Sequence, residues 1–412
     1  MPKFIKFLSL NVLLAFGLMF SACGGDDVET VSNNATLGAE EAAAISLDNA
    51  TASVTENLSA NATSSEVREV LGIGFVYVSP IEQMGWTYEH NQARLALDKL
   101  EGVVSTYVEN ESTGPDAERV MQSMASKGYD LIIATSVGYG DSVLKVAAEY
   151  PEVKFLHCAG TTTAPNVSTY FGRMYEARYL TGMVAGAMTK NKSIGYVAAF
   201  PLPEVIRGIN AFTLGVREVN PDAEVRVVWT REWYNPVEEA NAVEFLVNTA
   251  AVDVVAQHTD SKAPQETAEK LGIYSIGYHS DMSAVAPTAH LVAAVWHWEP
   301  FYIDVVEKLK QGEWNEVDYW GGLGDGIVNI SPFAAAVPQD VQDRVAARKN
   351  EIAEGQYIVF QGPLYDYNGE LRIPEGEIIA DQDLRLMDWF VNGVLVMADA
   401  ETQQPEEVTP LE

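Results

Sequence analysis

Apolar runs rich in β-branched and aromatic residues alternate with amphipathic stretches along the chain from Leu71 onward. The apolar runs cover residues 71–79, 129–136, 153–160, 194–200, 224–230, 252–258, 273–279 and 291–297. Continuous apolar strands separated by amphipathic helices are typical of a parallel sheet that is covered on both faces. One helix is predicted from Asp116 to Lys127, because an acidic residue begins it and Gly128 follows it. The pattern therefore predicts an α/β fold.

The same pattern occurs twice, in the same order and at nearly one offset of 120 to 123 residues. The repeated pairs are 73–76 with 194–197, 130–136 with 253–259, and 153–157 with 273–277. Such a repeat predicts two lobes of one doubly wound topology. Ligands of doubly wound sheets bind beyond the carboxyl ends of the strands, so the two lobes can share one cleft that closes by a hinge.

The N-terminus has the order of a secretory signal: two lysines, an apolar run over residues 7–20, and then small residues that lead to Cys23. The run is shorter than the roughly 20 apolar residues that a membrane-spanning helix needs. Phe20 to Cys23 resembles the bacterial lipobox, in which the cysteine carries lipid, although Phe20 replaces the usual leucine. We expect a signal peptide over residues 1–22 and lipidation of Cys23. A plain secreted protein cut near Ala22 is the alternative.

Residues 24–66 contain eight acids and no Lys or Arg, and are rich in Ala, Ser, Thr and Asn. This composition predicts a flexible tether, residues 23–66, between a membrane anchor and a globular body. The only other cysteine is Cys158. If Cys23 carries lipid, Cys158 has no disulfide partner and is expected to pack as a small buried residue.

Six stretches of the body are similar to a known family of binding proteins. They are GWTYEHNQARLAL (85–97), GRMYEARYLTGMVAGAMTK (172–190), AFPLPEVIRGINAFTLG (199–215), DVVAQHTDS (253–261), SIGYHSDM (275–282) and YWGGLGDGIV (319–328). Together with the lipobox and tether, they resemble the basic membrane protein family of ABC-transporter solute-binding lipoproteins, whose members include purine nucleoside receptors. The resemblance extends over about residues 72–394.

The resemblance implies a type I periplasmic-binding-protein fold, with two doubly wound parallel-sheet lobes joined by a hinge. It places residues 67–193 and 295–318 in the N-terminal lobe, residues 194–294 and 319–396 in the C-terminal lobe, and an acidic tail at 397–412. It also implies a monomeric receptor without a cofactor and without enzymatic activity. Such a receptor is lipid-anchored in a bacterial cell envelope, faces the periplasm or exterior, and delivers its ligand to the membrane permease of an ABC importer.

The segments that follow the predicted strands are aromatic and acidic. The candidate ligand-binding residues are Trp86, Tyr139, Phe200, Trp233, His258, Asp260, Asp281, Trp296 and Trp298. Flat aromatic faces suit a heteroaromatic ligand, since each base-on-aromatic stack contributes roughly 1 to 3 kcal/mol. Carboxylates accept hydrogen bonds from ring N–H and amino groups. The absence of a basic cluster among these residues disfavours nucleotides, because a phosphate would meet no positive partner. Trp233 is as compatible with packing at the rim of the cleft as with a ligand contact.

Family members stack the base between two aromatic residues, and the positions that match are Trp86 and Phe200. Asp281 matches the polar partner of the ring. Two departures lie where the family often binds the ribose: His258 to Ser261 replace a glycine-rich loop, and Trp296 to Trp298 replace the neighbourhood of a lysine. We therefore expect a purine base, adenine-like, more than a nucleoside.

Two alternatives use the same cleft. A sugar receptor would also combine aromatic faces with carboxylates. A zinc or manganese site could form from two His-x-Asp pairs, residues 258 and 260 with residues 279 and 281. An enzyme is disfavoured, because His157 and Cys158 are adjacent on a strand and point to opposite faces, and no G-x-S-x-G, H-E-x-x-H or Walker sequence is present.

Acidic residues outnumber basic ones, 58 to 26, which gives a net charge of −32 and a pI near 4.4. Removing residues 1–22 removes two lysines and no acids, so the expected mature chain carries 24 basic and 58 acidic residues, or −34. Neutralising phosphates requires clustered Lys and Arg, so a nucleic-acid partner is excluded.

Overall fold

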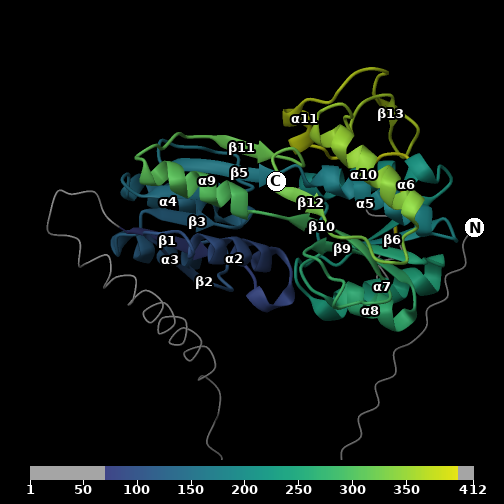
Figure 1. The fold of residues 1–412 in the computed structure, drawn as a ribbon, viewed down its shortest axis with the longest axis horizontal. Coiled ribbons are helices and arrows are strands. Elements are labelled where there is room, and N and C mark those ends of the chain that lie inside the picture. Colours follow the sequence, from purple (N-terminus) through teal and green to yellow (C-terminus); the bar gives the residue numbers. More distant parts are fainter. Residues whose placement is uncertain (1–69, 398–412) are drawn as a thin grey trace, which may run out of the picture. The chain divides into compact units, whose positions relative to one another are not determined.

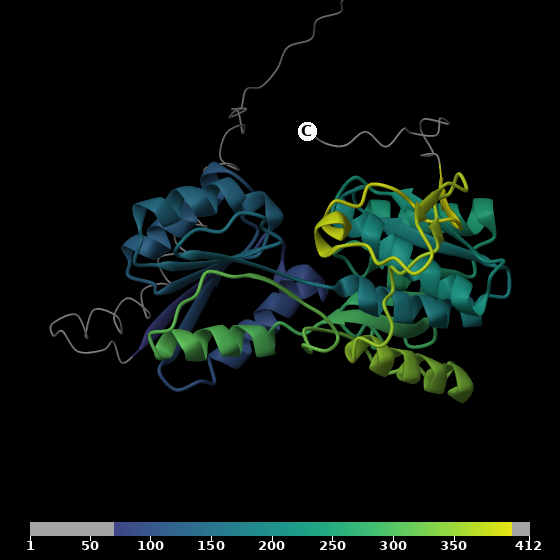
Figure 2. The ribbon, with the colours of Figure 1, turned by 90° about the horizontal axis from the view of Figure 1, so that it is seen from above.

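The computed structural model describes residues 70–397, which form two large, mainly parallel sheets and one small hairpin (Figures 1 and 2). The first sheet has the order β11-β5-β4-β3-β1-β2 and is parallel throughout. Its strands are β1 (Leu71–Val76), β2 (Val103–Val108), β3 (Leu131–Ala134), β4 (Lys154–Cys158), β5 (Val167–Gly172) and β11 (Asp318–Gly321).

The second sheet has the order β12-β10-β9-β8-β6-β7-β15, and only β12 runs antiparallel to its neighbour. Its strands are β6 (Ser193–Ala198), β7 (Glu224–Trp229), β8 (Val254–His258), β9 (Tyr274–His279), β10 (His290–Trp296), β12 (Val328–Ile330) and β15 (Val394–Val396). The order β4-β3-β1-β2 in one sheet matches β9-β8-β6-β7 in the other. The predicted repeat of one α/β topology is therefore confirmed.

Helices cover both faces of each sheet, which explains why the central strands β1, β3, β6 and β8 are almost fully buried. In the first lobe these are α2 (Trp86–Leu97) and α9 (Glu299–Lys310) on one face, and α3 (Pro115–Ser126) and α4 (Gly140–Glu149) on the other. Successive residues of β1 serve the two faces: Phe75 packs with Leu97 and Tyr302, whereas Val76 packs with Met121 and Val143. The predicted helix at 116–127 is α3.

The second lobe is built in the same way. Its helices are α5 (Met174–Met188), α6 (Pro203–Val219), α7 (Pro236–Ala250), α8 (Ala263–Leu271), α10 (Gln339–Ala353) and α11 (Asp381–Arg385). Tyr196 of β6 packs toward α5 and α6, and Val197 packs with Val243 of α7. Two 3-10 turns, η1 (Ile81–Gln83) and η2 (Val137–Tyr139), and the hairpin β13 (Leu364–Tyr365) with β14 (Leu371–Ile373) complete the elements.

The chain changes sheet between β5 and β6, between β10 and β11, and between β11 and β12. The expected crossings at 294/295 and 318/319 fall inside β10 and β11 rather than after them. Helix α5, which was expected in the N-terminal lobe, packs on α6, β10 and β12 of the second sheet. Helix α9 returns to the first lobe late in the sequence, as Figures 1 and 2 show.

No helix among residues 70–397 combines the length and the apolar character needed to span a bilayer. The expected signal peptide, lipidated Cys23, tether and most of the acidic tail lie outside the described residues. Cys158 is buried and free, as expected for a small core residue.

Candidate functional site

A cavity of about 130 Å³ lies between the lobes, at the carboxyl ends of the strands. The first lobe lines it with Ser79, Trp86, Thr135, Ser136 and Phe171, among others. The second lobe lines it with Glu204, Trp233, His258, Asp260, Tyr278 and His279, together with Tyr234. A single buried water needs only about 10 to 15 Å³, so this space is large enough for a small organic molecule.

Trp86 is fixed at the start of α2 by contacts on several sides. Its indole Nε1 donates a hydrogen bond of 2.7 Å to the carbonyl oxygen of Thr135 at the end of β3. Trp296 and Trp298 meet it edge to face, with ring centroids 5.5 and 5.8 Å away. Phe171 of β5 lies 6.2 Å from it and also lines the cavity. The indole is therefore held before a ligand arrives, which lowers the entropic cost of stacking on it.

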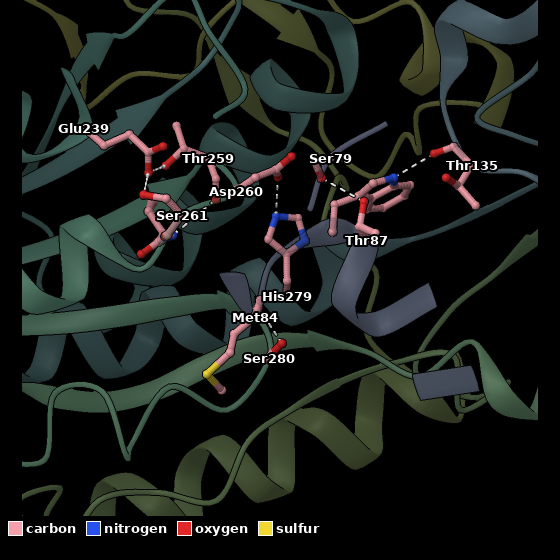
Figure 3. A network of polar contacts seen from close by, with 12 residues as sticks. Ser79, Met84, Thr87, Thr135, Glu239, Thr259, Asp260, Ser261, His279 and Ser280 are labelled. Carbon is pink, nitrogen blue, oxygen red and sulfur yellow. Dashed lines mark hydrogen bonds and ion pairs between the residues drawn. The ribbon is translucent and has the colours of Figure 1, made fainter. Parts of the chain in front are cut away.

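The loop after β8 points Asp260 into the cavity because its neighbours point the other way (Figure 3). Glu239 of α7 accepts hydrogen bonds from the hydroxyls of Thr259 and Ser261, at 2.7 and 2.8 Å. Asp260, between these two residues, lines the cavity. Its backbone N–H also donates to the carbonyl of Trp233 at 2.8 Å. Glu239 thus holds both neighbours of Asp260 and so helps to position this one cavity residue.

Asp260 and His279 form a buried pair, visible in Figure 3, with Oδ1 and Nε2 3.0 Å apart. The atoms are close but not aligned for a hydrogen bond, and neither ring nitrogen of His279 has a hydrogen-bond partner within residues 70–397. Burial raises the pKa of Asp260 to about 7. Burial, reinforced by the Arg178 guanidinium, holds the pKa of His279 well below its usual range. At neutral pH the imidazole is therefore uncharged, with one N–H and one free lone pair.

The lobes touch directly at the edge of the cavity. The Ser280 hydroxyl of the second lobe donates a 2.6 Å hydrogen bond to the carbonyl of Met84 in the first. A Cβ atom on Gly85 would lie 2.2 Å from the carbonyl oxygen of Asp260. Only glycine allows this approach of the two backbones.

Four of the nine expected ligand-binding residues line the cavity: Trp86, Trp233, His258 and Asp260. Phe200 does not line it and instead contacts Trp233 with ring centroids 5.6 Å apart. Trp296 and Trp298 stack on each other, and both contact the indole of Trp86 edge to face. These three residues therefore contact residues that line the cavity but do not line it themselves.

The remaining two expected residues lie elsewhere. Tyr139 is buried in the first-lobe core, and its hydroxyl donates to the carbonyl of Glu111 at 2.8 Å. The Asp281 side chain is 44% exposed, with Oδ1 3.7 Å from His290. It accepts from the backbone N–H of Ser283. Asp281 was the expected polar partner of the ligand, but the carboxylates that face the cavity are Glu204 and Asp260.

The expectation from sequence missed several lining residues. Glu204 and His279 were not among the nine expected ligand-binding residues, although His279 was a ligand of the metal alternative. Both have titratable side chains at or just after the end of a predicted strand, which could have marked them as candidates. Phe171 gave no such signal, because β5 was not predicted. The four ligands of the metal alternative do not converge, since Asp281 points away. Within residues 70–397 no group of three or more His, Cys, Asp or Glu side chains is placed to hold a metal ion.

Comparison with known proteins identifies the family. Residues 70–359 match the family described as "ABC transporter substrate-binding protein PnrA-like". This chain belongs to that family. It is a substrate-binding protein of an ABC transporter, works outside the cytoplasm, and is not an enzyme. The resemblance stated from the sequence motifs is confirmed, as is the type I binding-protein fold.

Two relatives and one solved structure illustrate the similarity of this substrate-binding protein to others. A purine-binding protein of Brucella abortus is 40% identical over 333 residues, which cover 80% of this chain and 95% of the relative. A Haloferax volcanii protein named for glucose binding is 37% identical over 298 residues, which cover 72% of this chain and 76% of the relative. The structure of a solute-binding protein from Conexibacter woesei superimposes with a TM-score of 0.61 at 22% sequence identity and covers 70% of this chain and 98% of its own. At this identity the similarity supports the fold and nothing more.

Proposed function

We propose that this substrate-binding protein captures a purine base, adenine-like, in the cavity between its lobes and delivers it to the membrane permease of an ABC importer. The observation that carries the proposal is the cavity itself, where Trp86, Phe171 and Trp233 offer flat faces beside the Asp260–His279 pair. The 40% identity with a purine-binding protein supports the same ligand class.

The arrangement suits a planar base that has hydrogen-bonding edges. Aromatic rings from both lobes can contact its faces, and each such stack contributes roughly 1 to 3 kcal/mol. Asp260 with neutral His279 offers an acceptor and a donor side by side, which matches the amino group and adjacent ring nitrogen of adenine. Asp260 thus takes the role that the sequence suggested for Asp281.

The test is direct identification of the ligand. The protein is purified without added ligand, denatured, and the released molecule is identified by mass spectrometry. Isothermal titration and thermal shifts with adenine, hypoxanthine, adenosine and glucose then rank the candidates, because a ligand that binds only the folded state raises its stability. Recovery of a hexose, or shifts with sugars and none with purines, would contradict a purine ligand.

A sugar is the second candidate, because one relative is named for glucose binding. Carboxylates accept from sugar hydroxyls as well as from ring N–H groups. The same ligand panel decides between them.

We also propose that Cys23 carries lipid and that residues 23–66 tether a monomeric body to the bacterial cell envelope. Metabolic labelling with a radioactive fatty acid should mark the intact chain and not Cys23→Ala, which should appear in the soluble fraction. Light scattering of the purified body should give the mass of one chain. Equal labelling of both chains would contradict the anchor.

A further inference from the structure

Glu204 is a second carboxylate in the cavity, separate from Asp260. It lies in the first turn of α6, just after β6, whereas Asp260 follows β8. Although protein surrounds it, its side chain keeps some exposed surface, and it lines both the main cavity and a second, smaller one. The exposed part of Glu204 therefore faces the ligand space.

The Glu204 carboxylate has no hydrogen-bond partner or ion pair in the part of the chain that the structure describes. Arg207, one turn later, donates instead to the carbonyl of Leu384 at 2.6 Å. Burial raises the pKa of Glu204, and the Asp260 carboxylate adds to this, whereas the Arg207 guanidinium opposes it. The positive end of the α6 dipole also favours the anion. The carboxylate is enclosed by protein on most sides, is exposed to the cavity and receives no hydrogen bond from the described residues, so this position is suited to a donor supplied by a ligand.

The smaller cavity limits what a ligand can carry on the edge that faces Glu204. It measures about 10 Å³ and is bounded by Tyr175, Arg207, Gly208 and Tyr278 as well as by Glu204. This is the space of one water molecule at most. A ligand edge at Glu204 can therefore end in an N–H group, but no ribose fits beyond it.

The carboxylates of Asp260 and Glu204 differ in the hydrogen-bonding groups next to them. Asp260 is paired with His279, so this side of the cavity presents an acceptor and a donor together. Glu204 presents only an acceptor. Adenine has the same asymmetry: its amino group lies next to a ring acceptor, and its imidazole N–H, the more acidic donor, is on the other ring. A charged acceptor forms its strongest hydrogen bond with the more acidic donor.

We infer that Glu204 accepts the imidazole N–H of an unsubstituted purine base and thereby makes the site select free bases over nucleosides. The inference rests on the proposed function. It assigns the two edges of the base to two carboxyl groups, with the amino edge at Asp260 and the imidazole edge at Glu204.

The experiment is isothermal titration of the full-length protein with adenine, 9-methyladenine, 7-methyladenine, N6-methyladenine and adenosine. Adenine should bind on the order of 100-fold or more tightly than 9-methyladenine and adenosine, since a site built to bind an N–H strongly rejects an analogue without it. Glu204→Ala removes the acceptor and opens space, so adenine should weaken and the ratio to 9-methyladenine should fall below about 10. Glu238→Ala, which removes an exposed carboxylate in the first turn of α7, is the matched control.

The outcomes separate the inference from the proposed function. If adenine and 9-methyladenine bind the unaltered protein equally well, the role of Glu204 is overturned while purine binding stands. The same holds if N6-methyladenine is rejected and 9-methyladenine is accepted, because the base would then lie the other way round. If no purine binds, the proposed function fails, and the inference fails with it. The unaltered protein supplies these results even if Glu204→Ala does not fold.

Discussion

The two lobes share one topology but contribute different chemistry to the cavity. The first lobe lines it with Trp86, Phe171, small residues and hydroxyls, and with no ionisable acid or imidazole. The second lobe supplies Glu204 from the first turn of α6, His258 and His279 from the ends of β8 and β9, and Asp260 from the loop after β8. A repeated fold therefore fixes where a ligand lies, while the loop residues decide what each side offers it. In this protein aromatic residues of both lobes offer surfaces for stacking, whereas the ionisable groups of the cavity come from the second lobe.

The largest effect should come from blocking the approach of the two lobes. In Gly85→Ala the added Cβ would meet the Asp260 carbonyl at 2.2 Å, a backbone atom that cannot move aside easily. We expect ligand affinity to fall by roughly 100-fold or more, as for other misplacements of a binding surface. Titration measures the affinity, and the melting temperature of the ligand-free protein is the control. An unchanged affinity would mean that the lobes need not meet here.

Removing the stacking surface of the first lobe should have the next largest effect. Trp86→Ala should weaken adenine binding by about 5- to 150-fold, which corresponds to a stacking contribution of roughly 1 to 3 kcal/mol. Trp314→Ala is the matched control, because Trp314 donates to the carbonyl of Pro165 and is not part of the cavity lining. If both variants bind equally well, the first lobe does not provide the stacking surface.

Affinity should depend on pH through Asp260 in the second lobe. Its pKa of about 7 is raised by burial, and a ligand N–H favours the ionised form. Binding of adenine should therefore weaken up to about tenfold for each pH unit below 7. Asp260→Asn should bind more weakly and lose this dependence, whereas Asp281→Asn, which alters an exposed carboxylate, should keep it. Titrations at pH 6, 7 and 8 would measure it.

The same carboxyl group should affect the stability of the ligand-free protein in the opposite sense. Because the folded pKa lies above the ordinary value of 3.8, the protonated group favours the folded state below that value, and this contribution is lost as pH rises through about 7. The difference corresponds to at most about 4 kcal/mol. Asp260→Asn should thus raise the melting temperature more at pH 8 than at pH 5. Glu204, Glu239, Tyr278 and His279 interact electrostatically with this group and can spread the transition.

The smallest expected effect concerns the single hydrogen bond between Ser280 and the Met84 carbonyl. Ser280→Ala should weaken ligand binding by about 2- to 10-fold, because one hydrogen bond contributes roughly 0.5 to 1.5 kcal/mol. The melting temperature of the ligand-free protein should change little. A loss as large as that of Gly85→Ala would instead make this hydrogen bond a main determinant of lobe contact.

Much of the fold could be predicted because it depends on local patterns. Continuous apolar runs predicted the central strands, which are buried on both faces. The repeat of residues 73–76 at 194–197 predicted two matching sheets. The half-exposed strand β2 and the strand β5 were not predicted. Strand β2 lies at an edge of the sheet and is only partly buried, so its sequence VVSTYV mixes polar with apolar residues and does not form a continuous apolar run.

Asp260 and Asp281 show what the sequence could not decide. Each aspartate lies two residues after the histidine that ends a strand, so the two are equivalent in sequence. After β8, Glu239 holds both neighbours of Asp260 and turns its carboxylate into the cavity. After β9, His279 adopts a φ of +69°, which redirects the chain and leaves Asp281 at the surface. Backbone direction at one residue separates a cavity-lining carboxylate from an exposed one.

The sequence by itself determined the α/β class, the repeated topology, the family, and the strand ends at which a ligand site would form. Local hydrophobic periodicity and family motifs carry that information. Only the tertiary structure decided that Trp296 and Trp298 contact Trp86 without lining the cavity, that Phe171 lines it, and that Asp281 does not. These outcomes depend on contacts between segments far apart in the chain and on single backbone dihedrals, and neither is encoded in a local pattern.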